Sequence, residues 1–268
     1  MTGEQIQYIP IVKITEETPF VKTFYFPQML PSRPGQFVML WLPGIDQKPF
    51  SVGSADGEKF GLTIFKRGPL TSALFEKHVG DRAGLSGPYG TAFSVRPNTH
   101  YIMVGGGYGA APLAYLAEQA VAINATVDFC IGARSQEHLL FEKRLRQLPG
   151  VTLHITTDDG SSGQKGLVTD VFKKLTEKAA NNTLVATCGP ELMEKSVLDI
   201  CNEKNIDCEI SIERYMKCGT GVCGQCCVDP LGIAMCQQGP VVSKNLANKI
   251  TEFGVYHRDK SGKKKYFE

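Results

Sequence analysis

The stretch Tyr101-Ile102-Met103-Val104-Gly105-Gly106-Gly107-Tyr108-Gly109-Ala110-Ala111-Pro112 joins an apolar strand to a glycine-rich turn and then to the start of a helix. It fits the pattern G-x-G-x-x-A in the strand-turn-helix context that a dinucleotide-binding domain needs. Its glycines allow a tight turn, and a pyrophosphate can sit on the N–H groups at the start of the helix. We therefore expect Gly105, Gly107 and Gly109 to bind a nucleotide, with a plain steric turn as the alternative.

Alternating strand and helix patterns extend from this turn over residues 99–210. Apolar runs typical of strands occupy residues 101–104, 126–131, 151–156, 183–187 and 207–212. Helical patterns lie between them, at residues 112–121, 139–148, 170–180 and 191–204. Such alternation predicts a doubly wound parallel sheet with helices on both faces. We assign residues 99–210 to a nucleotide-binding α/β domain.

Two further turns follow strands of this sheet and should lie at its carboxyl edge, where open α/β folds bind ligands. Arg134 follows the second strand and is expected near an adenosine ribose, or else as a solvated loop charge. Asp128 is at the usual distance for a ribose-binding acid but lies inside that strand, so we interpret it as structural. Cys188 and Gly189 follow the fourth strand, where a small polarizable thiol can face a nicotinamide ring or simply fill space.

The N-terminal part, residues 1–98, has a different pattern, in which short apolar runs alternate with polar residues and turns. Phe37-Val38-Met39-Leu40-Trp41 is one of these runs. Short strands punctuated in this way predict a small antiparallel β-barrel. A single helix is expected at residues 70–79, with Thr71 or Ser72 as its N-cap.

Near the C-terminus, Cys218-Gly219-Thr220-Gly221-Val222-Cys223-Gly224-Gln225-Cys226 and the later Cys236 follow the pattern C-x4-C-x2-C-x9-C. The spacing of the first three cysteines is one that holds 2Fe-2S clusters. Glycine accepts positive φ and lets N–H groups approach the negative charge of a cluster. We expect a small iron-sulfur subdomain that transfers single electrons. Its predicted metal ligands are Cys218, Cys223, Cys226 and Cys236.

Zinc binding and disulfides are the alternatives for these cysteines. A structural zinc site usually has two separate C-x2-C hooks, whereas this set has a wide gap filled with glycine. Cys227 would have to replace Cys226 at a less suitable spacing, so we interpret it as a small buried residue. Free cysteines elsewhere are expected to behave as small apolar residues. These are Cys130, Cys201 and Cys208.

The 268-residue chain, with 42% hydrophobic residues, is long enough for two domains and an appendage. Its net charge of +2 is too small to imply a nucleic-acid partner, and the basic tail at residues 260–265 reads as a solvated terminus. Residues 1–10 carry no signal-peptide pattern, and no apolar run reaches the about 18 residues of a membrane helix. We expect a cytoplasmic protein with reduced thiols and no membrane contact.

Four motifs together resemble the ferredoxin reductase flavoprotein family, whose barrel binds flavin and whose second domain binds a nicotinamide nucleotide. They are Lys48-Pro49-Phe50-Ser51, Gly87-Pro88-Tyr89-Gly90, the turn at residues 105–112, and Cys188-Gly189-Pro190. Glu213-Arg214-Tyr215-Met216-Lys217-Cys218-Gly219 and the cysteine loop narrow the resemblance. With them, the chain is similar to electron-transfer subunits of dihydroorotate dehydrogenase, which carry FAD and a 2Fe-2S cluster beside an FMN-containing catalytic subunit.

This resemblance implies roles in flavin binding. Lys48 takes the place of an arginine that usually contacts the flavin pyrophosphate, and it keeps the charge but not the bidentate fork. Phe50 would pack on the isoalloxazine and Ser51 would bond near its N5 atom; without the resemblance, Phe50 reads as a core aromatic and Thr71 as a simple cap. The remaining implied contacts are Pro49, Ile64, Lys66, Gly68, Thr71 and Ser72, with the last three on the flavin phosphates.

The implied activity is that of an oxidoreductase subunit with no catalytic side chain of its own for dihydroorotate. Electrons would pass from the FMN-containing catalytic subunit through the 2Fe-2S cluster and FAD to NAD+, in pyrimidine biosynthesis, within a heterotetramer. FAD would convert between single electrons and hydride pairs. The domains would be 1–98 for FAD, 99–210 for NAD and 211–268 for the cluster.

Two other functions stay open at this point. Related FAD and 2Fe-2S subunits serve ferredoxin:NADP oxidoreductases, hydrogenases and sulfite reductases, and the shared fold does not choose among them or between NAD and NADP. A module of another class would bind zinc through the cysteines and sense a nucleotide. Visible absorption separates this last function from the others, because flavin and 2Fe-2S colour a protein and zinc does not.

Overall fold

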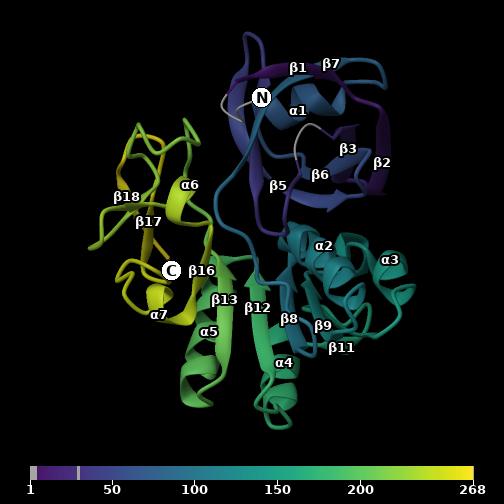
Figure 1. Ribbon diagram of the computed structural model, residues 1–268, viewed down its shortest axis with the longest axis vertical. Coiled ribbons are helices and arrows are strands. Elements are labelled where there is room, and N and C mark those ends of the chain that lie inside the picture. The colour runs from purple at the N-terminus through teal and green to yellow at the C-terminus, as the bar shows by residue number, and fades with distance from the viewer. Residues whose placement is uncertain (1–4, 29–30, 268) are drawn as a thin grey trace.

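A barrel, a parallel sheet and a C-terminal segment are arranged side by side in the computed structural model, which describes residues 5–28 and 31–267. In Figure 1 the barrel lies at the top, the parallel sheet and its helices lie below it, and the yellow C-terminal segment lies beside both. The predicted combination of an antiparallel barrel with an α/β domain is confirmed. No helix in the described ranges is long and apolar enough to cross a membrane.

The barrel is formed, within the described residues, by seven antiparallel strands in the order β1-β7-β4-β5-β6-β3-β2. They are β1 (Gln7–Pro10), β2 (Lys13–Thr18), β3 (Val21–Pro27), β4 (Phe37–Leu42), β5 (Asp46–Ala55), β6 (Lys59–Phe65) and β7 (Arg82–Tyr89). The edge strand β1 also lies against β3, so the sheet curls toward closure. Phe24, Leu40 and Leu62 are fully buried inside it. The short apolar runs thus supply the inner face of a barrel.

One short helix, α1 (Pro69–Phe75), covers the barrel with its buried leucines. The helix was expected at residues 70–79, so its predicted C-terminal end is wrong. It stops early because the following residues form a turn in which the Asp81 carboxylate accepts a hydrogen bond from the His78 N–H at 2.8 Å. The N-cap is Gly68, not either of the hydroxyl residues expected there.

The second sheet has the strand order β11-β10-β9-β8-β12-β13-β16 in the described part of the chain. Its strands are β8 (His100–Gly106), β9 (Thr126–Ala133), β10 (Val151–Thr157), β11 (Gln164–Lys165), β12 (Thr183–Cys188), β13 (Asp207–Ser211) and β16 (Val241–Ser243). All neighbouring pairs are parallel except β13 with β16. The order reverses between β8 and β12, which makes this pair the topological switch point where open α/β sheets bind ligands.

Helices cover both faces of this sheet, as the alternating pattern predicts. They are α2 (Ala110–Val121), α3 (Glu142–Arg146), α4 (Val168–Thr176) and α5 (Glu191–Glu203), with short 3-10 turns at Gly107–Gly109 and Gln136–His138. Apolar side chains of α2 and α3 form one core with the sheet, and those of α4 and α5 form another. Helices α3 and α4 are shorter than expected, because apolar spacing continues into turns that the sequence pattern does not separate from helix.

The C-terminal segment leaves the parallel sheet after β13 and returns to it as β16. At the base of this excursion the Ile212 N–H donates to the Pro240 carbonyl at 2.9 Å. The segment and the tail contain β14 (Cys227–Val228), β15 (Ile233–Ala234), α6 (Met235–Gln238), α7 (Lys244–Ala247), β17 (Tyr256–Arg258) and β18 (Lys264–Tyr266). Sequence patterning did not predict that β16 would complete the nucleotide-binding sheet.

The three parts share apolar cores. Tyr115 of α2 belongs to the barrel core, and its hydroxyl donates to the Ser32 carbonyl at 2.8 Å. The core between the parallel sheet and α5 continues into the C-terminal segment through Cys226 and Cys236, and it reaches Met39 of β4. The cysteine-bearing segment is therefore packed against both the barrel and the parallel sheet.

Candidate cofactor and electron-transfer site

Two glycine-rich turns meet at the switch point between β8 and β12. A Cβ atom on Gly109 would lie 2.4 Å from the Cys188 carbonyl oxygen, and one on Gly106 would lie 2.6 Å from the Pro190 ring. Only glycine allows this approach, and Gly107 has φ +54°, which also favours glycine. The structure thus brings Gly105, Gly107 and Gly109 together with Cys188 and Gly189 at the carboxyl edge of the sheet.

The Cys188 thiol lies at this edge as a neutral group. Burial raises the pKa of Cys188, and the nearby carboxyl groups of Glu194 and Glu213 add to the effect. Burial also raises the pKa of Glu194 well above its ordinary value, although the Gly189 N–H donates to its carboxyl oxygen at 3.0 Å. The Glu194 carboxyl, whose protonated form is favoured by burial, therefore supports the backbone of the Cys188 turn. The sequence patterns did not single out Glu194.

Arg134 is exposed at the end of β9, beside the turn at residues 157–161. The Asp159 N–H donates to the Arg134 carbonyl at 3.3 Å, so both turns belong to the same edge of the sheet. Asp128 lies inside β9, with its carboxylate oxygens 2.7 Å from His154 Nε2 and 3.1 Å from His100 Nε2. It has the structural role expected of it.

The predicted flavin motif lies on β5, where Lys48 is engaged by two partners. Its ammonium group is 2.7 Å from the Asp46 carboxylate and donates to the Tyr215 hydroxyl at 3.1 Å. Burial opposes the charged form of Lys48, but these hydrogen bonds outweigh burial and raise its pKa. Phe50 and Ser51 follow on the same strand and are half-buried. The motif therefore keeps a fixed positive charge beside partly accessible side chains.

The residues around the start of α1 form a compact turn beside this motif. The Thr71 hydroxyl accepts from the N–H groups of Arg67 and Gly68, at 2.9 Å each, and donates to the Gly68 carbonyl at 3.0 Å. Thr71 is thus not the N-cap itself; from the third helical position its side chain bonds back to the N-cap residue Gly68. The Ser72 N–H donates to the Gly68 carbonyl at 2.8 Å. Ile64 and Lys66 lead into this turn from the end of β6.

The four predicted metal ligands come together as two pairs of thiols. The Cys218 thiol contacts the Cys223 thiol, and the Cys236 thiol contacts the Cys226 thiol. In the described part of the chain, no three His, Cys, Asp or Glu side chains surround a point that would hold a single ion. A di-iron cluster takes two thiolates on each iron, so paired thiols suit its donor set.

Backbone N–H groups point at these sulfurs. The Thr220 N–H donates to Cys218 Sγ at 3.4 Å, and the Gly221 N–H donates to Cys236 Sγ at 3.2 Å. Gly219, Gly221 and Gly224 have φ of 76°, 80° and 67°, as the loop prediction requires. Such donors stabilise negative charge on sulfur, so the loop fits an anionic cluster.

The same contacts shift the thiol pKa values in opposite directions. Burial opposes ionisation of Cys218, but N–H groups of Cys223 and Thr220 outweigh it and lower the pKa of Cys218 to about 6. Burial and the adjacent Cys226 thiol raise the pKa of Cys236 to about 12. Cys227 lies in β14 and is only half-buried, so its interpretation as a buried residue is wrong. Burial, followed by the nearby Cys226 and Cys223, raises the pKa of Cys227, so its thiol lies close to the four predicted ligands but belongs to neither pair.

The cysteine loop lies directly against the barrel. A Cβ atom on Gly219 would lie 2.9 Å from the Met39 side chain and 3.2 Å from the Tyr89 ring. Met39 is the register partner of Pro49 in the flavin motif. Just before the loop, Tyr215 bonds to Lys48 and lies under its ammonium group, 5.1 Å from nitrogen to ring centre. The predicted cluster site and the predicted flavin site are therefore neighbours.

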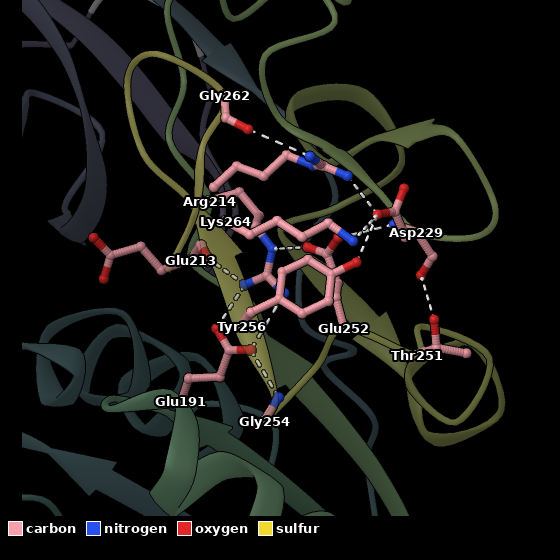
Figure 2. A network of polar contacts seen from close by, with 11 residues as sticks. Glu191, Glu213, Arg214, Asp229, Thr251, Glu252, Gly254, Tyr256, Gly262 and Lys264 are labelled. Atoms are coloured by element: carbon pink, nitrogen blue, oxygen red, sulfur yellow. Dashed lines mark hydrogen bonds and ion pairs between the residues drawn. The ribbon is translucent and has the colours of Figure 1, made fainter. Parts of the chain in front are cut away.

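A buried network ties the same segment to the nucleotide edge (Figure 2). Arg214 donates from Nε to Glu252 at 2.7 Å and from Nη1 to Glu191 at 2.6 Å. Glu252 also accepts from the Asp229 N–H at 2.9 Å, and Glu191 accepts from the Gly254 N–H at 2.8 Å. Glu191 begins α5, directly after the Cys188 turn, so the network joins the two sites.

Tyr108 completes the contacts between the sites. Its ring stacks on Phe65 of β6 at 6.4 Å, and its hydroxyl donates to the Glu213 carboxylate at 3.2 Å. The charge of Glu213, followed by burial, raises the pKa of Tyr108. Arg214, Tyr215 and Tyr108 were not among the predicted site residues. One feature of the sequence could have pointed to Arg214: it is a charged residue between the apolar residues Ile212 and Met216.

Comparison with known proteins places these features in one family. Residues 103–199 match the oxidoreductase NAD-binding domain, and residues 213–246 match the iron-sulfur cluster binding domain of dihydroorotate dehydrogenase B. A protein of Methanocaldococcus jannaschii, named a probable dihydroorotate dehydrogenase B (NAD(+)) electron transfer subunit, is 44% identical over 257 residues, 96% of this chain and 97% of its own. The chain belongs to the family of dihydroorotate dehydrogenase B electron transfer subunits.

Other proteins support membership in the dihydroorotate dehydrogenase B electron transfer subunit family and its fold. A relative of the same name from Methanothermobacter thermautotrophicus is 40% identical over 262 residues, 96% of both chains. A solved structure of the NADH-dependent reduced ferredoxin-NADP oxidoreductase aligns with a TM-score of 0.80, 26% identity and coverage of 92% of this chain and 94% of that one. Amycolatopsis cytochrome P450 reductase has the same fold at a TM-score of 0.67 and 21% identity, covering 75% of this chain and 67% of its own.

Proposed function

We propose that this chain is the subunit that carries electrons from an FMN-containing dihydroorotate dehydrogenase catalytic subunit, through a 2Fe-2S cluster and FAD, to NAD+. The observation that carries the proposal is the contact between the cysteine loop and the barrel. Gly219 lies against Met39, the register partner of Pro49, and Tyr215 bonds to Lys48. A donor site for single electrons therefore adjoins a flavin motif.

The barrel residues would hold FAD, which exchanges hydride with nicotinamide and single electrons with an iron-sulfur centre. The Lys48 ammonium group would contact the flavin pyrophosphate. Its hydrogen bonds raise the pKa of Lys48 and so keep the group charged. Phe50 would cover one face of the ring system, and Ser51 would supply a hydroxyl at its edge. The further proposed contacts are Pro49, Ile64, Lys66, Gly68, Thr71 and Ser72.

The cysteine loop would hold the cluster through Cys218, Cys223, Cys226 and Cys236. The N–H groups of Thr220 and Gly221 already point at two of these sulfurs. Hydrogen bonds to sulfur stabilise the more reduced and more negative state of a cluster, so these donors would raise its potential. Cys227 would take no part.

The nucleotide edge would bind NAD through its two touching turns. Gly105, Gly107 and Gly109 would leave room for the pyrophosphate at the start of α2. Arg134, exposed at the end of β9, would contact the adenosine ribose. Cys188 and Gly189 would face the nicotinamide, where a neutral thiol adds no charge beside the positive ring.

The partner would be the FMN-containing catalytic subunit, because nothing in the proposed roles provides a site for dihydroorotate. Val222 at the tip of the cysteine loop is 87% exposed, and the adjacent Cys223 is exposed as well. Electrons can therefore enter at the outer side of the loop without crossing the protein. We propose a heterotetramer, and functional domains at residues 1–98, 99–210 and 211–268.

A subunit of a ferredoxin-linked NADP oxidoreductase is the second candidate function. The solved oxidoreductase structure with a TM-score of 0.80 supports it, since the alignment covers 92% of this chain. The identity is 26% in that comparison and 44% with the dihydroorotate dehydrogenase B relative. This difference favours dihydroorotate oxidation.

The test pairs Cys223→Ser with Cys227→Ser in chain that is co-expressed with the FMN-containing subunit and purified without oxygen. We expect Cys223→Ser to lose the 2Fe-2S absorption and dihydroorotate:NAD+ activity while retaining FAD, because one iron loses a thiolate. Cys227→Ser should retain both, since its thiol lies outside the set. A normal iron-sulfur spectrum in Cys223→Ser would refute the ligand assignment, and ferredoxin-dependent NADP reduction by the native chain would favour the second candidate.

A further inference from the structure

The C-terminal hairpin of β17 and β18 carries a local excess of positive charge that the net charge of the whole chain conceals. Five cations lie between residues 258 and 265. Two of them, Arg258 and Lys264, face the Asp229 carboxylate. The other three are exposed and have no ion-pair partner within the described residues. They are Lys260, Lys263 and Lys265.

The hairpin is held firmly, so these lysines project from a fixed support. The Tyr256 hydroxyl donates to Asp229 at 2.6 Å, and the Lys264 ammonium group lies 4.1 Å from the centre of the Tyr256 ring. Asp229 in turn donates its N–H to Glu252, which pairs with Arg214 (Figure 2). The same buried network that links the cluster segment to the nucleotide edge therefore anchors the hairpin.

The tip of the hairpin adjoins the cysteine loop. Gln225, which lies between Cys223 and Cys226, donates from its side-chain amide to the Asp259 carbonyl at 3.0 Å. On the barrel side, the charge of Lys260 contributes to lowering the pKa of Asp46. The unpaired lysines thus lie next to the exposed side of the loop, where an electron donor has to approach.

We propose that Lys260, Lys263 and Lys265 form an electrostatic docking surface for an acidic patch on the FMN-containing catalytic subunit. The inference rests on the proposed function, and it specifies which residues guide the partner and by what force. Opposite charges steer two proteins into the productive orientation and raise their association rate by about 10- to 1000-fold at low salt. Rim charges act mainly on association and not on dissociation.

An acidic protein surface suits this hairpin better than a nucleic acid. A nucleic-acid site usually needs a basic stripe across a whole face, whereas this chain has a net charge of +2 and its basic excess is confined to one hairpin. Asp259 at the tip also places a negative charge among the lysines. Three projecting cations around one carboxylate match a small patch of carboxylates on a protein.

The test compares two variants that remove the same charge. K260Q/K263Q/K265Q neutralises the hairpin, and K173Q/K174Q/K178Q neutralises three exposed lysines in and after α4, which lies at the bottom of the molecule in Figure 1, away from β17 and β18. Association of each FAD- and cluster-loaded chain with the FMN-containing subunit is followed by stopped-flow at 20 mM and 500 mM salt. NADH:ferricyanide activity without the partner reports an intact subunit.

We expect the hairpin variant to associate about tenfold more slowly at 20 mM salt, with no difference at 500 mM salt and unchanged ferricyanide activity. The α4 variant should associate like the native chain. Equal association of all three chains would overturn the docking surface while leaving the proposed function intact. Failure of the native chain to bind the FMN-containing subunit would overturn both the docking surface and the proposed function. A third outcome would also overturn the docking surface. In it, the native chain binds a 20-nucleotide RNA, and the hairpin variant loses this binding but associates normally with the FMN-containing subunit.

Discussion

Glu194 is a carboxyl group held out of water, with 1% of its surface exposed, behind the turn that carries Cys188. Burial and the nearby Glu191 and Glu213 raise its pKa well above the ordinary value of 4.5, although the hydrogen bond from the Gly189 N–H lowers it. The folded chain therefore retains a proton that the unfolded chain releases. Stability is unaffected below about pH 4.5 and falls as the pH rises from there toward the folded pKa.

Glu194→Gln should remove this pH dependence, because an amide carries no titrating proton and still offers an oxygen to the Gly189 N–H. We expect the thermal midpoint of the variant to exceed that of the native chain increasingly as pH rises from 5 to 8. The limiting slope is about 1.4 kcal/mol per pH unit. Glu203→Gln, at the exposed end of the same helix, is the control. Parallel midpoint curves for Glu194→Gln and the native chain would show that Glu194 ionises normally.

Single residues were predictable where their chemistry is tied to spacing along the chain. The four cysteines predicted to bind the cluster and the glycines between them follow a local pattern, and the structure brings the four thiols together in two pairs. Arg214 and Glu194 depend on contacts with residues far along the chain or on burial by several elements. Such surroundings arise only after folding, so the local sequence gave little sign of them.

At the scale of elements, one buried network fixes α5 to the cysteine-bearing segment and the C-terminal hairpin. The side chain of Arg214 is 2% exposed, that of Glu252 is 0% exposed and that of Glu191 is 10% exposed. Removing one partner of a buried pair leaves a charge without compensation, which costs more than the intact pair contributes. The position of the cluster loop relative to the nucleotide edge therefore depends on one guanidinium group.

Arg214→Met should destabilise the chain by about 3 to 5 kcal/mol, because Glu252 and Glu191 stay buried without their partner. Urea unfolding of the FAD- and cluster-loaded protein measures this. The free energy of unfolding of Arg214→Lys should lie between those of the native chain and Arg214→Met, since an ammonium group cannot replace the three donor nitrogens of the guanidinium group. Arg146→Met breaks an exposed pair with Glu142 and should cost less than about 0.5 kcal/mol. Similar losses for Arg146→Met and Arg214→Met would contradict the role of burial.

Element types followed from periodicity, but their ends and partners did not. The strands and helices of residues 99–210 appear in the predicted order, whereas α1 and α4 stop before their predicted ends. Side-chain bonds such as that between Asp81 and the His78 N–H decide where a helix ends. The three residues of β16 carry no pattern long enough to predict that they would pair with β13.

At the scale of the whole molecule, the barrel and the parallel sheet have their own extensive cores, whereas the cysteine-bearing segment has little regular structure. Its sheet of β14 and β15 has two residues in each strand. Bound iron would therefore supply much of the order in this segment, as metals do in small metal-binding units. The barrel and the parallel sheet do not need bound iron to stay folded, because each has its own apolar core.

Removal of iron with dithionite and a chelator should loosen the segment and leave the rest folded. We expect amide hydrogen exchange to accelerate at residues 217–243, which include β16, and in the hairpin, with slow exchange preserved in β3 to β6 and β8 to β9. FAD should stay bound, because its proposed contacts lie on the barrel. Mass spectrometry of peptides before and after extraction gives the comparison. Rapid exchange throughout the barrel would mean that the cluster stabilises the whole chain.

The return of the chain as β16 has a consequence for cells that lack iron. β16 pairs with β13 and covers the outer edge of the parallel sheet, and the loop that positions it is the one that carries the cysteines. A bare strand edge offers unpaired N–H and C=O groups to other chains and promotes aggregation. Iron starvation would then leave an uncapped sheet as well as a subunit without its cluster, and the protein would tend to precipitate or be degraded.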